Sequence, residues 1–358
     1  MKERRKTRLI RVGDVRVGGG APISVQSMTN TDTRDVRATI GQIRSLAREG
    51  CEIVRVAVPD EAAVRAFRRI RAASPIPVIA DIHFHHRFAI ACADAGANGL
   101  RINPGNIGGE ERTREVLSAA RANGIPVRIG VNAGSLEKDL LRKYGGPTPR
   151  ALAESAARWV RFCEKARFTR LKFSLKASDV VATVEANRLF SRRFDYPLHI
   201  GVTEAGTTFS GTVKSAVGLG ILLSEGIGDT LRVSLTGPPE EEVRAGWQIL
   251  KSLGLRERGP DFISCPTCGR ASIDVTGIAL EVERRLSRLE VPLKVAVMGC
   301  AVNGPGEARE ADVGVAGGKG EGLIFVKGKI MKKVKEKEIV AEVVRLARRL
   351  AASGRRAR

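Results

Sequence analysis

The sequence predicts an α/β protein in which a (β/α)8 TIM-type barrel is followed by a smaller α/β domain. Strand-like and helix-like segments alternate regularly from residue 24 to about residue 253, and the alternation occurs eight times. Eight such repeats fit a closed barrel better than an open doubly wound sheet. From about Arg256 the regular alternation of strand-like and helix-like segments changes, which predicts a second domain.

The elements of the barrel can be placed along the chain from its periodicity. A short hairpin is expected over residues 8–17, turning at Gly13 and Asp14. The eight strands are predicted at residues 24–28, 53–58, 77–82, 99–103, 126–131, 171–176, 198–203 and 230–235. Helical periodicity lies between them, for example over residues 34–48 and 151–165. Glycines stand where helices should end, at Gly50, Gly96, Gly124 and Gly226.

The second domain is expected to begin after a linker at Gly259 and Pro260. We predict a helix over residues 275–289, a strand over 293–298, short strands over 312–315 and 322–326, and a closing helix over 338–351. The two domains are accordingly predicted to comprise residues 1–255 and 256–358.

Composition restricts the class of protein. With 358 residues and 43% hydrophobic residues, the chain can bury a core in each domain. No apolar stretch reaches membrane-spanning length and no signal peptide is visible, so we expect a cytoplasmic protein that does not associate with membranes.

The net charge of +22 permits two interpretations. A basic surface could bind nucleic acid, but aromatic residues make up only 4% of the chain and no stacking motif accompanies the arginines, so no specific nucleic acid is expected. Much of the charge lies in the N-terminal arm, in residues 327–337 and in the tail 354–358. The remainder could steer a polyanionic small molecule or an acidic protein partner.

Three of the six cysteines form a pattern typical of a metal site. Cys265 and Cys268 are a close pair, and Cys300 is a distant third thiol. Three thiolates are one short of filling a four-iron cluster, and an oxygen donor such as Glu307 could hold the fourth iron. Structural zinc is the alternative, although zinc ribbons normally bring a second close pair. The other cysteines, Cys51, Cys92 and Cys163, stand alone in apolar surroundings and are interpreted as core residues.

Polar side chains occur in the predicted barrel strands, where apolar runs are expected. They recur at a spacing of two, so each group shares one face of its strand. They are Arg55, Asp81, His83, Arg101, Asn103, Arg128, Asn132, Lys172, Ser174, Lys176, His199, Glu204, Arg232 and Ser234. An unpaired buried cation costs several kcal/mol, and Asp81 and Glu204 are too few to neutralise the set. Most members lie towards the carboxyl ends of the strands, which predicts a phosphate or diphosphate ligand at the barrel mouth.

Several of these residues have competing interpretations. Asp-Ile-His-Phe-His-His could suggest a metal site, but we favour a ligand contact for His83, with His85 as the alternative. Glu204, just past a strand end, is either an acid/base catalyst or the counter-ion of a neighbouring cation. Glu307 is either a metal ligand or an ordinary loop carboxylate.

Six segments together resemble one family. They are SVQSMTNTDT (24–33), LRINPGNIG (100–108), RIGVNAGSL (128–136), HIGVTEAG (199–206), SCPTCGR (264–270) and MGCAVNGPGE (298–307). In this order, over about residues 24–315, the chain resembles the 4-hydroxy-3-methylbut-2-enyl diphosphate synthases of the non-mevalonate isoprenoid pathway, in their compact bacterial form. The resemblance implies a barrel followed by an iron–sulfur domain. It also implies the reductive ring opening and dehydration of 2-C-methyl-D-erythritol 2,4-cyclodiphosphate to (E)-4-hydroxy-3-methylbut-2-enyl diphosphate.

Roles for individual residues follow from the resemblance. The implied ligands of a 4Fe-4S cluster are Cys265, Cys268, Cys300 and Glu307, with Glu307 replaceable. The implied diphosphate site comprises Arg55, Arg101, Asn103, Arg128, Asn132, Lys176, Arg232 and Ser234. His83 and Glu204 would lie nearer the reacting carbons, with Glu204 giving a proton to the departing hydroxyl.

The resemblance also implies partners. Flavodoxin or ferredoxin would donate electrons, and a head-to-tail homodimer would complete the site with the cluster domain of a second copy. Two rival functions are a zinc-dependent barrel enzyme acting on a phosphorylated metabolite and a basic RNA-binding protein with a zinc module. The arginines are embedded in strands, which argues against the RNA-binding protein.

Overall fold

The computed structural model describes residues 1–302 and 304–355. It divides the chain into two compact units, one from Met1 to Arg256 and one that begins at Glu257, one residue later than the sequence analysis placed the boundary. Asn303, within the predicted metal-binding segment, and residues 356–358 of the basic tail lie outside the described residues.

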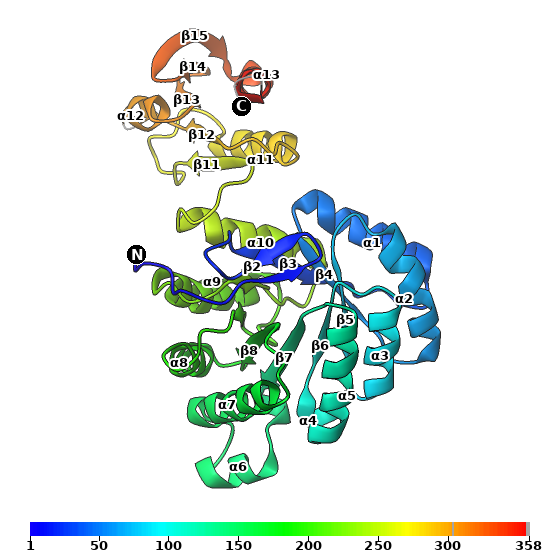
Figure 1. The fold of residues 1–358 in the computed structure, drawn as a ribbon. Helices are drawn as coiled ribbons and strands as arrows, with labels where there is room; N and C mark the ends of the chain where they lie inside the picture. Colours follow the sequence, from blue (N-terminus) through cyan, green and yellow to red (C-terminus); the bar gives the residue numbers. More distant parts are fainter. Residues whose placement is uncertain (303, 356–358) are drawn as a thin grey trace. The chain divides into compact units, whose positions relative to one another are not determined.

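The first unit is a nearly closed barrel of eight parallel strands, as predicted (Figure 1). The hairpin β1 (Ile10–Val12) and β2 (Val15–Val17) precedes it. The barrel strands are β3 (Ser24–Met28), β4 (Ile53–Ala57), β5 (Val78–Ile82), β6 (Gly99–Ile102), β7 (Val127–Asn132), β8 (Leu171–Lys176), β9 (His199–Ile200) and β10 (Thr230–Leu231). Their order in the sheet is β8-β7-β6-β5-β4-β3-β10-β9.

The last two strands are two residues long, so the predicted lengths of six residues were wrong. The chain bends soon after β9, where Glu204 and Gly206 have φ angles of 52° and 117°. Between β8 and β9 only an isolated bridge, from Phe173 to Leu198, joins the two ends of the sheet. Two backbone hydrogen bonds cross this seam, from Phe173 N–H to the Pro197 carbonyl and from Thr203 N–H to the Ala177 carbonyl, so the pairing is shorter here than between β7 and β8.

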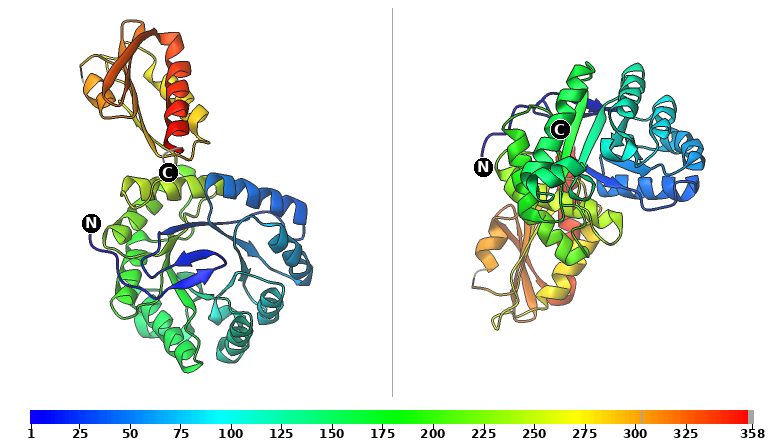
Figure 2. Two further views of the ribbon diagram at one scale, coloured as in Figure 1. Left: turned by 45° about the horizontal axis from the view of Figure 1, so that its top comes forward. Right: turned by 90° about the horizontal axis from the view of Figure 1, so that it is seen from below.

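Helices surround the strands in a ring (Figure 2). They are α1 (Val36–Glu49), α2 (Glu61–Ala73), α3 (His86–Asp94), α4 (Pro104–Ile107), α5 (Gly109–Ala122), α6 (Lys138–Tyr144), α7 (Pro149–Lys165), α8 (Val180–Ser191), α9 (Thr208–Ser224) and α10 (Pro239–Ser252), with a 3-10 turn at Ala133–Ser135. Asp35 and Thr148 accept hydrogen bonds at helix starts, and Gly50 ends α1 in a left-handed conformation, as its place in the sequence predicted.

Alternation along the strands separates two environments. Phe173 points outward from β8 and packs against Phe190 of α8 and Tyr196. Its neighbours Lys172 and Ser174 point the other way, into the barrel. The main apolar core thus lies between strands and helices. The barrel interior is largely polar, apart from a small apolar cluster in which Ile53 and Ile79 pack against Ile10, Val12 and Val17 of the β1–β2 hairpin.

The second unit is a five-stranded sheet with helices on its faces. Its elements are β11 (Pro260–Ser264), α11 (Val275–Leu286), β12 (Leu293–Met298), α12 (Gly304–Arg309), β13 (Val313–Gly318), β14 (Glu321–Val326), β15 (Lys329–Lys335), a 3-10 turn (Glu336–Glu338) and α13 (Ile339–Arg355). The sheet order is β11-β12-β13-β14-β15, with β11, β12 and β13 parallel.

Two of these strands were not predicted. Pro260 begins β11, where the sequence suggested a linker. The edge strand β15 is almost wholly exposed and rich in lysine, so it shows no apolar alternation. Among the described residues, no helix is both long and apolar enough to cross a membrane.

Candidate active site

The barrel interior gathers most of the predicted anion-binding residues. Arg55, Arg101, Arg128 and Lys176 come from four different strands and are all buried, with at most 7% of each residue exposed. Parallel pairing sets Arg101 beside Arg128 and Asn132 beside Lys176. The predicted cationic residues therefore lie on the stretch of the barrel wall from β4 to β8.

Asp81 is the carboxylate at the centre of this group. Its two oxygens accept hydrogen bonds from Arg55 Nη1 at 3.1 Å and Arg101 Nη1 at 3.0 Å. Burial alone would raise the pKa of Asp81, but Arg101, Arg55 and Arg128 outweigh that effect and hold the pKa well below its ordinary value. Asp81 is thus a fully ionised structural counter-ion.

A second carboxylate comes from a helix and was missed by the sequence analysis. Glu242, in the first turn of α10, accepts hydrogen bonds from Arg232 Nε and Nη2, both at 2.9 Å. It also accepts from Ser27 Oγ at 2.8 Å and from the Leu235 backbone N–H at 3.1 Å. In sequence it is one of three consecutive glutamates, so only its burial distinguishes it.

Arg128 and Lys176 have no such carboxylate beside them. The Nε and Nη1 atoms of Arg128 are buried without a hydrogen-bond partner among the described residues. Burial, followed by repulsion from Arg55 and Arg101, lowers the pKa of Arg128. Burial, followed by repulsion from Arg128 and Arg55, likewise lowers the pKa of Lys176. Positive charge at these positions is costly until an anion is present.

Two glycines make room for these long side chains. A Cβ atom on Gly130 would lie 3.0 Å from Arg101 Nε. On Gly201 it would lie 2.6 Å from Lys176 Nζ and 2.4 Å from the Arg232 carbonyl oxygen. Glycine at both positions therefore lets the cations cross the interior.

The remaining predicted contacts lie at or just beyond the strand ends. Asn103 is buried, donates to Ser135 Oγ at 2.5 Å and caps α4. Asn132, Ser234 and His83 are partly exposed. His85 is exposed and stacks near Phe88, which leaves His83 closer to Asp81 in the barrel.

Glu204 is exposed in the loop between β9 and α9. Its φ angle of 52° is in the left-handed region, which a non-glycine residue adopts at a cost. The structure thus presents this carboxylate on a turn beyond the end of a barrel strand, and not as a buried counter-ion.

Cysteines lie at the carboxyl ends of two adjacent strands in the second unit. Cys265 directly follows β11, and Cys300 follows β12 after one glycine; Ser264 and Val297 are paired in the parallel ladder. Cys265 Sγ accepts a hydrogen bond from the Gly299 backbone N–H at 3.2 Å. Glu307 lies on the short helix α12 that follows.

The donor set suits a soft metal centre. A backbone hydrogen bond and the side chain of Arg270 lower the pKa of Cys268, which favours the thiolate form that binds metals. By contrast, burial raises the pKa of the core residues Cys51, Cys92 and Cys163 to about 12. As the side chains stand, no three His, Cys, Asp or Glu residues within 1–302 and 304–355 are arranged to hold a metal ion. The fit therefore rests on thiol chemistry and on placement at neighbouring strand ends.

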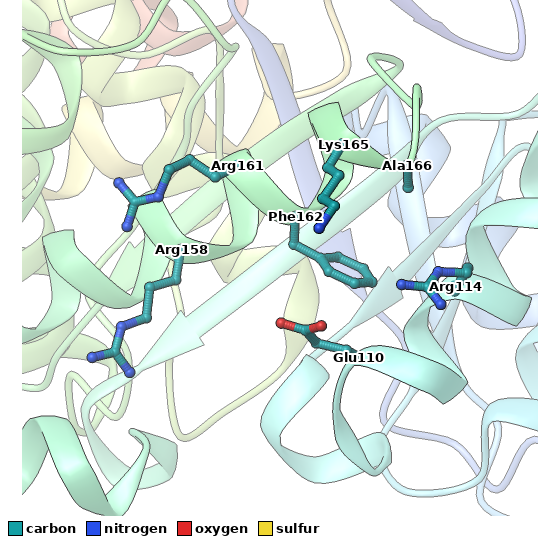
Figure 3. Close-up of a pocket in the computed structure, with 7 residues that line it drawn as sticks. All are labelled: Glu110, Arg114, Arg158, Arg161, Phe162, Lys165 and Ala166. Carbon is teal, nitrogen blue, oxygen red and sulfur yellow. The ribbon is translucent and has the colours of Figure 1, made fainter.

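A basic groove on the outside of the barrel is separate from this interior. It lies between α5 and α7 (Figure 3). Its lining residues are Glu110, Arg114, Arg158, Arg161, Phe162, Lys165 and Ala166. Arg158 is already paired with Asp139 and Glu154. The groove contains none of the predicted site residues.

A TIM-type barrel with buried basic side chains, followed in the chain by a small α/β domain with thiols at adjacent strand ends, defines a class of two-domain barrel protein. Within that class the chain belongs to the GcpE family. Residues 7–247 match the GcpE TIM-barrel domain and residues 261–349 match the GcpE protein C-terminal domain.

Relatives of known name match almost the whole chain. A 4-hydroxy-3-methylbut-2-en-1-yl diphosphate synthase (flavodoxin) of Geobacter sulfurreducens is 61% identical over 345 residues, which are 95% of this chain and 98% of the relative. A protein of the same name from Caldanaerobacter subterraneus subsp. tengcongensis is 58% identical over 96% of this chain and 97% of its own. Among solved structures, the Yersinia pestis dihydropteroate synthase overlays 69% of this chain and 98% of its own, with 13% identity and a TM-score of 0.49.

Removing the central carboxylate should destabilise the barrel. Asp81→Asn leaves Arg55 and Arg101 as unpaired buried charges, which typically costs about 3–5 kcal/mol. Because folding depresses the Asp81 pKa below its ordinary 3.8, this stability is present at neutral pH and is lost as pH falls below that value. Urea unfolding from pH 7 to pH 3 should show the gap between the two proteins narrowing at the acid end.

Asp139→Asn is the matched control, because Asp139 pairs with Arg158 on the surface and should change stability by less than about 1 kcal/mol. An Asp81→Asn protein as stable as the parent at pH 7 would contradict the assignment of Asp81 as a structural counter-ion.

Proposed function

We propose that this chain is a 4-hydroxy-3-methylbut-2-en-1-yl diphosphate synthase that opens and dehydrates 2-C-methyl-D-erythritol 2,4-cyclodiphosphate. The observation that carries the proposal is the buried, carboxylate-poor cationic interior of a barrel that matches such enzymes over nearly its whole length. A cyclic diphosphate supplies anionic oxygens for donors that have no partner in the protein.

The diphosphate would be held by residues from neighbouring strand ends. Arg128 provides buried donors without a partner and Lys176 a buried amino group, while Arg55, Arg101 and Arg232 are oriented by Asp81 and Glu242. Asn103, Asn132 and Ser234 add neutral donors at the rim. His83 would lie beside the substrate carbons.

The second unit would hold a 4Fe-4S cluster through Cys265, Cys268, Cys300 and Glu307. When bound, such a cluster would supply the two electrons of the reduction. The carboxylate of Glu307 is a harder ligand than the thiolates and is the one we expect to be exchangeable. A backbone N–H donor to Cys265, from Gly299, would stabilise its thiolate.

The charge balance of the proposed reaction defines what the protein must supply. The cyclodiphosphate dianion takes up two electrons and one proton, a C–O bond to the diphosphate breaks, and water leaves. The product is a diphosphate trianion, because the electron pair of the broken bond remains on the phosphate oxygen. The protein must therefore deliver one proton to the departing hydroxyl and accommodate one more negative charge on the diphosphate.

Flavodoxin is the electron donor named for the relatives, and we propose it for this chain. The strand register supports a basic docking edge near the cysteines. Lys333 of β15 is level with Met298, two residues before Cys300, across three strand spacings, roughly 14 Å at about 4.8 Å each. Lys332 and Lys335 are on the same edge strand, and Lys332 and Lys333 are paired with Glu342 and Glu321.

The proposal predicts that the protein contains iron and sulfide and converts the cyclodiphosphate. Anaerobically purified protein should contain about four iron and four sulfide per chain and should convert the cyclodiphosphate to the allylic diphosphate with reduced flavodoxin. Cys300→Ser should lose iron and turnover, while Cys163→Ser, in the barrel core, should keep both. Zinc without sulfide would favour the zinc-dependent alternative, and salt-sensitive RNA binding without turnover would favour the RNA-binding one.

Glu204→Gln should retain the visible absorbance of the cluster and lose turnover by about 10²–10⁴-fold, since a general acid typically contributes that much. The substrate should still bind. Glu61→Gln, an exposed carboxylate at the start of α2, should leave turnover unchanged. Normal turnover of Glu204→Gln would remove Glu204 from the proton-transfer step.

A head-to-tail homodimer is also part of the proposal. Helix α9 carries an exposed apolar stripe at a spacing of four: Phe209 (83% exposed), Val213 (49%), Val217 (51%) and Ile221 (37%). The stripe starts directly after the loop of Glu204, so a second copy docked along it would lie next to the barrel mouth.

Val217→Glu should place an uncompensated charge in that interface and yield a monomer by light scattering. The monomer should keep its iron and lose turnover. Val181→Glu, on α8 and 69% exposed, should remain dimeric. An active monomer of the parent protein would exclude the arrangement.

A further inference from the structure

Met28 is an apolar side chain in polar surroundings at the mouth of the barrel. It is the last residue of β3, so it lies at the carboxyl end of its strand, where barrel enzymes hold their ligands. It is partly exposed, and it belongs to none of the apolar clusters that the described residues form. A methionine that is not used in the core is available as an adaptable apolar surface for a ligand.

Strand alternation and one contact define the direction of the Met28 side chain. Val25, on the opposite face of β3, packs in the core between strands and helices. Gln26 and Met28 therefore face the barrel interior. There, Arg232 Nη1 donates a hydrogen bond to Met28 Sδ at 3.8 Å. A thioether sulfur is only a weak acceptor, but the contact shows that the Met28 side chain lies next to the guanidinium group.

Met28 lies between two of the arginines proposed to bind the diphosphate. Arg232 contacts it on one side, and on the other side Met28 is paired with Arg55 in the ladder between β3 and β4. The other strands present polar side chains or glycine at the inward-facing positions nearest the mouth, apart from Ala57 at the end of β4. Met28 is therefore the largest apolar side chain on the strand ends that face the candidate site.

The proposed substrate has two parts that require different contacts. The diphosphate carries the negative charge, which guanidinium and ammonium groups recognise. The carbon skeleton is uncharged and bears a methyl group, which these groups do not recognise. A partly buried thioether can give this part dispersion contacts and exclude water from it.

We propose that Met28 contacts the methyl-bearing carbon skeleton of the substrate, while Arg55 and Arg232 on either side of it bind the diphosphate. The inference rests on the proposed function and adds a specificity-determining residue to it. Met28 distinguishes the cyclodiphosphate from anions without a carbon skeleton, such as inorganic diphosphate. The skeleton is present before and after the C–O bond breaks, so the contact contributes to binding more than to the chemical step.

Calorimetric binding to holoenzyme without an electron donor tests this, because no turnover then occurs. The cyclodiphosphate and inorganic diphosphate are compared as ligands. Met28→Ala should weaken cyclodiphosphate binding roughly tenfold, the lower end of the range for a lost methylene contact. Its affinity for inorganic diphosphate should remain close to that of the parent. Met28→Leu conserves the apolar volume and should bind both ligands as the parent does.

Turnover gives a second readout. With reduced flavodoxin present, Met28→Ala should raise KM and leave kcat close to that of the parent, as expected when uniform binding is lost. Met28→Gln keeps the length of the side chain and replaces its apolar end with an amide, so it should show the same selective loss of cyclodiphosphate affinity. Val181→Ala removes an apolar side chain that is 69% exposed on α8 and should change neither binding nor turnover.

Equal weakening of both ligands by Met28→Ala would overturn the proposal, because Met28 would then act only by orienting the arginines. Unchanged binding of both ligands would overturn it as well. Failure of Met28→Ala and Met28→Gln to fold would assign Met28 to structure alone. If the parent holoenzyme neither binds nor converts the cyclodiphosphate, the proposed function itself fails. That outcome is distinct, because it does not depend on any substitution.

Discussion

Buried positive charge inside the barrel is the constraint on which the rest of the structure depends. Basic side chains from β4, β6, β7, β8 and the segment after β10 occupy a space that barrels usually fill with apolar residues. Asp81 and Glu242 neutralise part of this charge and hold the arginines in place. The glycines at 130 and 201 leave space for the side chains of Arg101 and Lys176.

The second unit also carries its candidate functional residues at the ends of parallel strands. Its parallel strands β11 and β12 bring Cys265 and Cys300 to one end of a sheet, where backbone N–H groups are also available. Loops there can carry reactive side chains because the sheet behind them is fixed by an apolar core. Each unit thus places its chemistry at the carboxyl ends of parallel strands.

Periodicity predicted six of the eight barrel strands to within one residue, because buried parallel strands have strong local patterns. The short strands β9 and β10 and the edge strand β15 could not be predicted in this way. The first two end where tertiary contacts bend the chain, and β15 has almost no buried face. In the site, strand residues such as Arg55 and Arg128 were evident because charge interrupts an apolar run. Glu242 was not, since a glutamate in the first turn of a helix is ordinary, and nothing in the sequence shows that it pairs with Arg232, which lies ten residues earlier.

The seam between β8 and β9 has a consequence for motion. These strands are joined by one bridge and two backbone hydrogen bonds, so local opening there costs less free energy than between β7 and β8, which pair over six residues. Lys176 stands on one side of the seam, and Gly201 and Arg232 on the other. An anion that contacts both sides would hold the two strands together, so that ligand binding would also reduce local opening of the barrel between β8 and β9.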